Sequence, residues 1–156
     1  MDIMAVRHKG TALVVLALAA FTAGCLDLTE GEPLEVIIWE GTLEPLPVPD
    51  APTPITGNMS MLADQTFTVM GVGVQGGEPD GRLGWEIRQG SCGAAGDLVG
   101  SPDVYPEFGL DELGMGEMQT VLNRRVADAP VYAGKVLSDA DSGSQLLACA
   151  DLIRRQ

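Results

Sequence analysis

Few residues in this chain could carry out chemistry, and their types exclude most kinds of catalytic site. The 156 residues include one histidine, His8, and three cysteines. His8 lies in an N-terminal segment that we expect to be removed, which leaves the mature chain without an imidazole to act as a general base or to bind redox copper. No Gly-x-Ser-x-Gly elbow and no glycine-rich phosphate loop occurs. We therefore expect no enzymatic activity.

Glu86 and Arg88 are charged residues two positions apart within a short apolar stretch. Side chains at this spacing project from the same face of a β-strand, so the two residues could form an ion pair. The alternative is that both are solvated on an exposed face, where an ion pair contributes little to stability. Neither arrangement is an acid–base site, because general acid–base catalysis needs a second titratable group with a separated pKa.

Acidic residues are frequent in the second half of the chain, and we interpret them as solvated. Six of them lie between residues 97 and 117, namely Asp97, Asp103, Glu107, Asp111, Glu112 and Glu117. The alternative for this run is weak binding of a divalent cation. Residues 139–143 match a calcium loop only in part, because Gly143 stands at a ligand position and no glutamate closes the loop. We expect a simple hairpin turn there.

The N-terminus has the pattern of an export signal. Arg7, His8 and Lys9 precede an apolar run, residues 11–21, that is short for a membrane span. The run ends in Phe-Thr-Ala-Gly-Cys25, which resembles the bacterial lipobox, with Thr22 where that motif usually has leucine. This predicts a signal peptide over residues 1–24, a lipidated Cys25, a tether over residues 25–33 and a location in the bacterial envelope. The alternatives are a plain secretory signal and an uncleaved anchor helix.

Removal of residues 1–24 leaves seven basic and 21 acidic residues, so the mature chain has a net charge of −14. A surface this acidic repels phosphate backbones, which excludes nucleic acid as a partner. The mature chain also keeps two further cysteines, Cys92 and Cys149. An even pair in an oxidising compartment is most simply a disulfide, and the alternative is two buried free thiols.

Short segments bounded by glycine, proline, aspartate or asparagine predict an all-β domain over residues 34–156. In residues 66–74 the alternation puts Thr68, Met70, Val72 and Val74 on one face of a strand. Five prolines in residues 45–54 predict a loop or sheet-edge segment between the first two strands. We expect Trp39 and Trp85 to be core or sheet-edge residues. The seven candidate strands are residues 35–43, 58–62, 66–74, 84–89, 118–126, 131–137 and 145–152.

Three segments carry a resemblance to a known family. Residues 84–92 (GWEIRQGSC) resemble the signature of the copper/zinc superoxide dismutases, in which an aromatic residue precedes His-x-His and a Gly-x-Cys follows. Residues 106–122 are similar to that family's turn and Asp-x-x-Gly loop, and residues 147–152 (LACADL) to its Leu-Ala-Cys-Gly close. The resemblance implies a Greek-key β-sandwich or barrel, and a disulfide between Cys92 and Cys149. A chordin-type domain is the nearest other assignment.

The sequence departs from that family at the metal ligands. The positions of three copper-binding histidines are occupied by Glu86, Arg88 and Leu137, and Leu146 stands where the family has an arginine. We therefore expect a dismutase-like scaffold with no cofactor and no dismutation, held to a membrane through Cys25. One alternative is a residual metalloprotein with carboxylate ligands. Another is a module that binds an envelope protein, or a second copy of itself, through a sheet edge.

Overall fold

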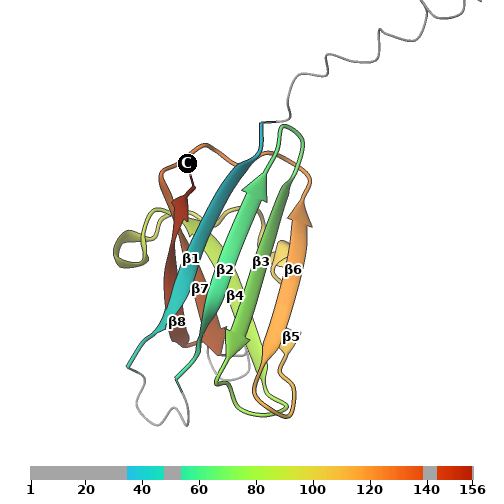
Figure 1. The fold of residues 1–156 in the computed structure, drawn as a ribbon, viewed down its shortest axis with the longest axis vertical. Helices are drawn as coiled ribbons and strands as arrows, with labels where there is room; N and C mark the ends of the chain where they lie inside the picture. Colours follow the sequence, from blue (N-terminus) through green and yellow to red (C-terminus); the bar gives the residue numbers. More distant parts are fainter. Residues whose placement is uncertain (1–34, 48–53, 139–143, 156) are drawn as a thin grey trace, which may run out of the picture. The chain divides into compact units, whose positions relative to one another are not determined.

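The structure, a computed structural model, describes residues 35–47, 54–138 and 144–155 (Figure 1). These residues belong to one of two compact units, Leu34–Gln156. The predicted signal peptide, Cys25, the tether over residues 25–33 and the hairpin at residues 139–143 lie outside the described residues, as does most of the proline-rich segment 45–54. No helix in the described ranges is long and apolar enough to cross a membrane.

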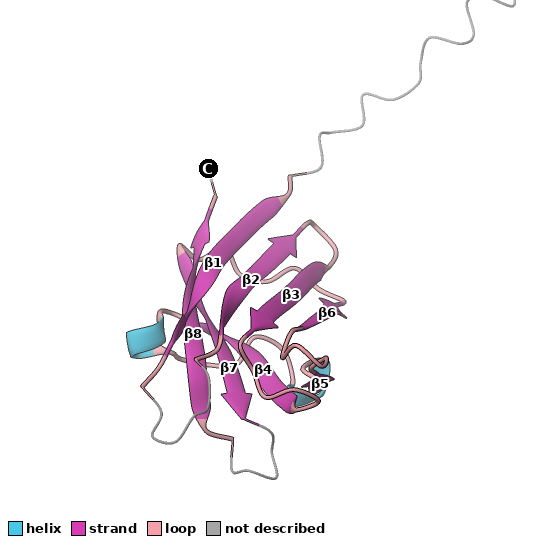
Figure 2. Ribbon diagram, turned by 60° about the horizontal axis from the view of Figure 1, so that its bottom comes forward, coloured by secondary structure: helices cyan, strands magenta, loops and turns pink. Residues whose placement is uncertain are grey.

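The described domain is all-β, as the sequence predicts. Eight strands form one antiparallel sheet in the order β5-β4-β7-β8-β1-β2-β3-β6, which curls until its two edge strands lie near each other (Figures 1 and 2). The sheet is therefore a nearly closed barrel. Its strands are β1 (Ile37–Pro45), β2 (Thr56–Ala63), β3 (Thr68–Gln75), β4 (Arg82–Gln89), β5 (Phe108–Gly109), β6 (Gly116–Leu122), β7 (Val131–Ser138) and β8 (Leu146–Arg154). Two short 3₁₀ helices, η1 (Cys92–Ala94) and η2 (Pro102–Val104), lie between β4 and β5.

The core fills the barrel with the side chains of alternate strand residues. In β3 the face with Thr68, Met70, Val72 and Val74 is buried, which confirms the predicted alternation. Trp39 and Trp85 are also buried, and both indole N–H groups donate to backbone carbonyls, those of Ala129 and Pro106 respectively. The two rings can be buried without leaving an unsatisfied polar group, because each indole nitrogen has a hydrogen-bond acceptor.

All seven predicted strands are present, and each of their ends but one lies within two residues of its predicted position. The exception is β6, which was expected to reach Val126 and ends at Leu122. Thr68 explains the early end, because its buried hydroxyl donates to the Arg124 carbonyl and accepts from the Val126 N–H. These contacts draw residues 124–126 away from the ladder and across the end of the barrel.

Candidate functional site

Glu86 and Arg88 lie on the outer face of β4, where the resemblance puts two metal ligands. Alternation in β4 turns Leu83, Trp85 and Ile87 into the core and leaves Glu86 and Arg88 half-buried outside. The two side chains are in contact, so the interpretation as an ion pair on one strand face is the one that fits this geometry. The solvated alternative does not describe them.

The ion pair between Arg88 and Glu86 is bidentate. Arg88 Nε donates to Glu86 Oε1 at 2.6 Å and Arg88 Nη2 to Glu86 Oε2 at 3.1 Å. The side chains are 34% and 18% exposed, respectively. The hydrogen bond to Glu86 raises the pKa of Arg88 above its usual value, which favours the charged guanidinium still further. Fork-to-fork pairing also fixes both side chains in one orientation.

The segment between β4 and β5 folds back over this pair. Arg88 Nη1 donates to the Gly96 carbonyl at 3.1 Å. Backbone hydrogen bonds join Gln89 N to the Asp97 carbonyl and Val99 N to the Ile87 carbonyl, both at 2.9 Å. Residues 96–99 thus pair with the free edge of β4.

A disulfide between Cys92 and Cys149, with a Cα–Cα distance of 6.0 Å, holds the other part of this segment to β8. The pairing predicted for these two cysteines is confirmed. The Cys92 N–H also donates to Asp151 Oδ1 at 2.6 Å, two positions further along β8. Figure 2 shows η1, which begins at Cys92, outside the barrel wall and beside β8.

The third ligand position, Leu137, lies on β7. In the ladder between β4 and β7, Leu137 is opposite Gly84 and Lys135 is opposite Glu86. Leu137 is also opposite Leu146 of β8, where the resemblance expects an arginine. The structure therefore brings Glu86 and Arg88 into contact. Leu137 is not part of this contact, because it is opposite Gly84, two positions before Glu86, and it pairs on its other side with the apolar Leu146.

Tyr105 is part of this region, and the sequence reasoning missed it. Its hydroxyl donates to the Val99 carbonyl at 2.5 Å and lies 3.3 Å from the Ile87 carbonyl. Its ring meets Trp85 edge to face, with centroids 5.1 Å apart. Burial raises the pKa of the Tyr105 phenol well above its usual value, so the group stays neutral.

The six acidic residues between positions 97 and 117 do not converge on one point. Glu107 is half-buried and pairs with Arg82, whereas the other five are exposed. Asp111 uses its carboxylate locally, accepting from the N–H groups of Leu113 and Met115, each at 2.9 Å. No group of three or more histidine, cysteine, aspartate or glutamate side chains within the described ranges has an arrangement that could hold a metal ion.

These contacts define what the site can do chemically. Both oxygens of the Glu86 carboxylate are bound by Arg88, so the group is engaged as an ion-pair partner. The pair fixes the covering segment against β4, through the bond from Arg88 to the Gly96 carbonyl and the bridge between Arg88 and Leu98. No family model, curated protein or solved structure matches the chain.

Proposed function

We propose that this protein is a lipid-anchored protein of the bacterial envelope whose superoxide dismutase-like Greek-key domain is a non-catalytic structural or partner-binding module. The observation that carries the proposal is the Glu86–Arg88 ion pair, because it fills the outer face of β4 where the resemblance puts two metal ligands. Arg88 is a permanent cation there, and a cation at a ligand position repels any metal ion.

The topology supports the dismutase-like part of the proposal. Three connections join strands that are not neighbours in the sheet, β3 to β4, β5 to β6 and β6 to β7, while the others join neighbours. Long returns of this kind are what a Greek key contains. The segments that carry the resemblance fall on β4, on the β5–β6 region and on β8, and the disulfide joins the first to the last.

Two measurements on the full chain, expressed in a bacterium and purified from its membranes, test the anchor. We expect mass spectrometry to find residues 1–24 removed and Cys25 carrying diacylglycerol and an amide-linked acyl chain, since two or more chains hold a protein stably on a bilayer. A Cys25→Ala variant should lose the lipid and leave the membrane fraction on washing. An unmodified Cys25, or a wild-type chain that washes off like the variant, would contradict the anchor.

Metal analysis and a superoxide-dismutation assay of the same purified protein, prepared without chelators, test the absence of catalysis. We expect far less than one equivalent of copper, zinc or manganese and no activity above buffer. Near-stoichiometric metal with activity, both lost in a Glu86→Gln variant, would instead establish the carboxylate metalloprotein. A Glu44→Gln variant is the control, because Glu44 is an exposed acid on a different strand, β1, outside the acidic run.

A second candidate function, self-association through a sheet edge, is favoured by β6. Among the described residues β6 pairs only with β3, and none of its residues is fully buried. An antiparallel pairing of two copies centred on Gln119 would put Glu117, the only charged residue of the strand, opposite Val121 of the second copy. No like charges would then face each other across the new ladder.

Sedimentation or light scattering of the unlipidated chain over a range of concentrations tests this candidate. Val121 is 51% exposed, so a Val121→Glu substitution should leave the barrel intact while it puts two glutamates opposite each other in the dimer. We expect dimerisation to weaken at least about tenfold in this variant, which corresponds to about 1.4 kcal/mol. The matched control is Ile153→Glu, at a residue 54% exposed on β8. A wild-type chain that is monomeric at every concentration would rule out the edge dimer.

A further inference from the structure

The basic residues of the domain are gathered at one end of the barrel. Four of the seven described basic residues are Arg124, Arg125, Arg154 and Arg155, which we call the arginine end. The strand register shows that these residues share one end, because Trp39 near the start of β1 is opposite Arg154 and Thr68 at the start of β3 is opposite Leu122. Figure 1 shows the starts of β1 and β3 at the same end as the tips of β6 and β8.

Charge is therefore distributed unevenly along the barrel. At the arginine end four arginines are matched by four carboxylates, those of Glu35, Glu40, Asp64 and Asp128, and the net charge there is zero. The rest of the described domain has three basic and eleven acidic residues, a net charge of −8. Near a negatively charged surface such a barrel is least repelled when its arginine end faces that surface.

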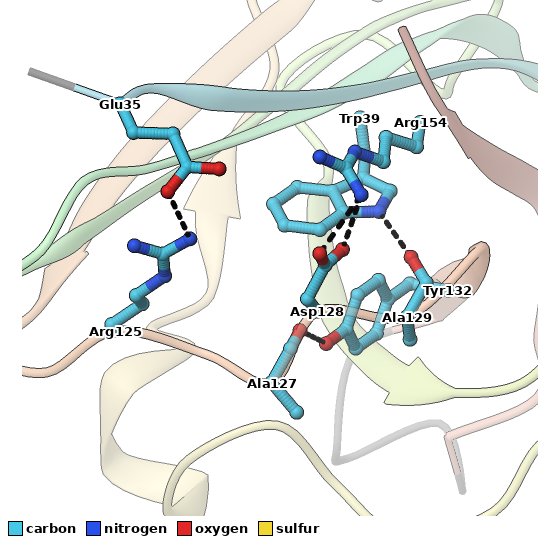
Figure 3. Close-up of polar contacts among 8 residues, drawn as sticks. All are labelled: Glu35, Trp39, Arg125, Ala127, Asp128, Ala129, Tyr132 and Arg154. Carbon is cyan, nitrogen blue, oxygen red and sulfur yellow. Dashed lines mark hydrogen bonds and ion pairs between the residues drawn. The ribbon is translucent and has the colours of Figure 1, made fainter. Parts of the chain in front are cut away.

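Polar contacts hold several side chains of the arginine end in fixed positions. The connection between β6 and β7 crosses the arginine end and is fixed by polar contacts at both ends (Figure 3). Arg154 Nη1 donates to both oxygens of Asp128, at 2.9 and 2.8 Å, and Arg125 lies 3.5 Å from Glu35. Arg124 is exposed and has no ion pair within the described part of the chain, so its guanidinium faces solvent.

Exposed apolar side chains accompany the arginines. Val36 is 45% exposed, Phe67 37% and Ile153 54%. Apolar and arginine side chains together are the composition of surfaces that sit in the headgroup region of a bilayer. The loop at the opposite end also exposes Leu113 and Met115, but these lie among acidic residues that anionic headgroups repel.

The covalent chain brings this end, and not the other, close to the proposed anchor. Glu35 is at the arginine end and follows Cys25 by ten residues, which can span at most about 35 Å. The opposite end of the barrel is further away by the length of β1, nine residues or about 30 Å. A lipid on Cys25 therefore keeps the arginine end within reach of the bilayer in every orientation.

From these observations we infer that the arginine end is a docking surface for an anionic phospholipid bilayer, on which the anchored barrel stands with its acidic end outward. The inference rests on the proposed function for the anchor at Cys25. The partner is the bilayer itself, recognised by arginines at phosphate headgroups and by apolar side chains at the interface.

The test makes the anchor chemically, so that it does not depend on lipidation in the cell. The chain from Cys25 onward is coupled through the Cys25 thiol to a maleimide phospholipid and bound to vesicles of phosphatidylcholine, alone or with an equal amount of phosphatidylglycerol. Hydrogen exchange followed by mass spectrometry then reports which segments the bilayer covers. We expect exchange in residues 64–67 and 123–128 to be slower by at least about threefold on the anionic vesicles, and the difference to vanish in about 0.5 M salt.

Matched charge variants decide whether the arginines are responsible. Arg124→Gln/Arg155→Gln should abolish the slowing, whereas Arg82→Gln/Lys135→Gln, which removes the same charge elsewhere, should preserve it. Equal exchange on both kinds of vesicle, slowing confined to residues 109–115, or slowing that survives Arg124→Gln/Arg155→Gln would each overturn the inference. An unlipidated Cys25 in the native protein would refute the anchor alone, because the coupled protein still measures the docking.

Discussion

Replacing Arg88 by methionine measures how much of the domain depends on the Glu86–Arg88 pair. The substitution removes two hydrogen bonds to Glu86 and one to the Gly96 carbonyl, and it leaves a carboxylate that is only 18% exposed without its cation. Fully exposed ion pairs contribute up to about 1 kcal/mol, and breaking a fully buried one costs about 3–5 kcal/mol. The partial burial of this pair puts the expected loss for Arg88→Met at about 2 kcal/mol.

Two further variants complete a double-mutant cycle, which separates the pairwise interaction between Glu86 and Arg88 from the cost of burying a charge. Glu86→Leu should cost only about 1 kcal/mol, because Arg88 is 34% exposed and keeps its bond to Gly96. The double variant Glu86→Leu/Arg88→Met buries no charge, so we expect it to cost about 1 kcal/mol or less. The coupling energy between the two residues is then about 2 kcal/mol.

Urea unfolding of the four proteins, followed by tryptophan fluorescence, gives these energies. With a slope of about 2 kcal/mol per molar, Arg88→Met should lower the midpoint by about 1 M urea. The exposed pair Glu35–Arg125, with an N–O distance of 3.5 Å, is the control and should show a coupling energy below about 0.5 kcal/mol. A coupling between Glu86 and Arg88 no larger than this control would refute the structural role that we assign to the pair.

Three further outcomes follow from other parts of the fold. Replacing both disulfide cysteines by alanine should cost at most about 4 kcal/mol for a sequence separation of 57, measured by urea unfolding against the disulfide-bonded wild type. Because burial raises the pKa of Tyr105 and Tyr132, their stabilising contribution is complete below pH 10 and lost as the pH rises above it, so phenolate absorbance should increase only together with alkaline unfolding. Gly114→Ala should cost more than about 1 kcal/mol, since its φ is +72° and a Cβ would meet the Gly77 backbone, whereas Gly93→Ala, with open space around it, should be neutral in thermal melts.

The fold class and the positions of seven strands could be predicted because their signals are local. Alternation of apolar residues marks β3 and β4, and glycine or proline marks the turns between strands. β5 could not be predicted in this way, since two residues are too few to show any alternation. Its place in the sheet comes from pairing with Arg82 and Leu83, more than twenty residues earlier in the chain.

The site was predictable only where its parts are close in sequence. Glu86 and Arg88 are two positions apart on one strand, so their contact followed from strand geometry. The segment that covers them is held by a disulfide that parity and compartment predicted. It is also held by Tyr105, whose partners are the Val99 and Ile87 carbonyls, and by Asp151, which binds the Cys92 N–H 59 positions away. A hydrogen bond to a backbone group does not depend on the type of the partner residue, so these contacts have no sequence signal.

Membrane docking and the β6 dimer compete, because a symmetric pair of identical strand edges is antiparallel. An antiparallel pairing about Gln119 points the arginine ends of the two copies in opposite directions along the strands, so only one of them can stand on a given bilayer. We therefore expect dimers of the lipid-coupled chain, detected by cross-linking, to be frequent on phosphatidylcholine vesicles and to become rare on phosphatidylglycerol-containing ones. The Val121→Glu variant should still dock, since it keeps all four arginines of the arginine end. Dimers that persist unchanged on anionic vesicles would mean that one of the two surfaces is wrongly assigned, and the exchange of residues 123–128 would identify which.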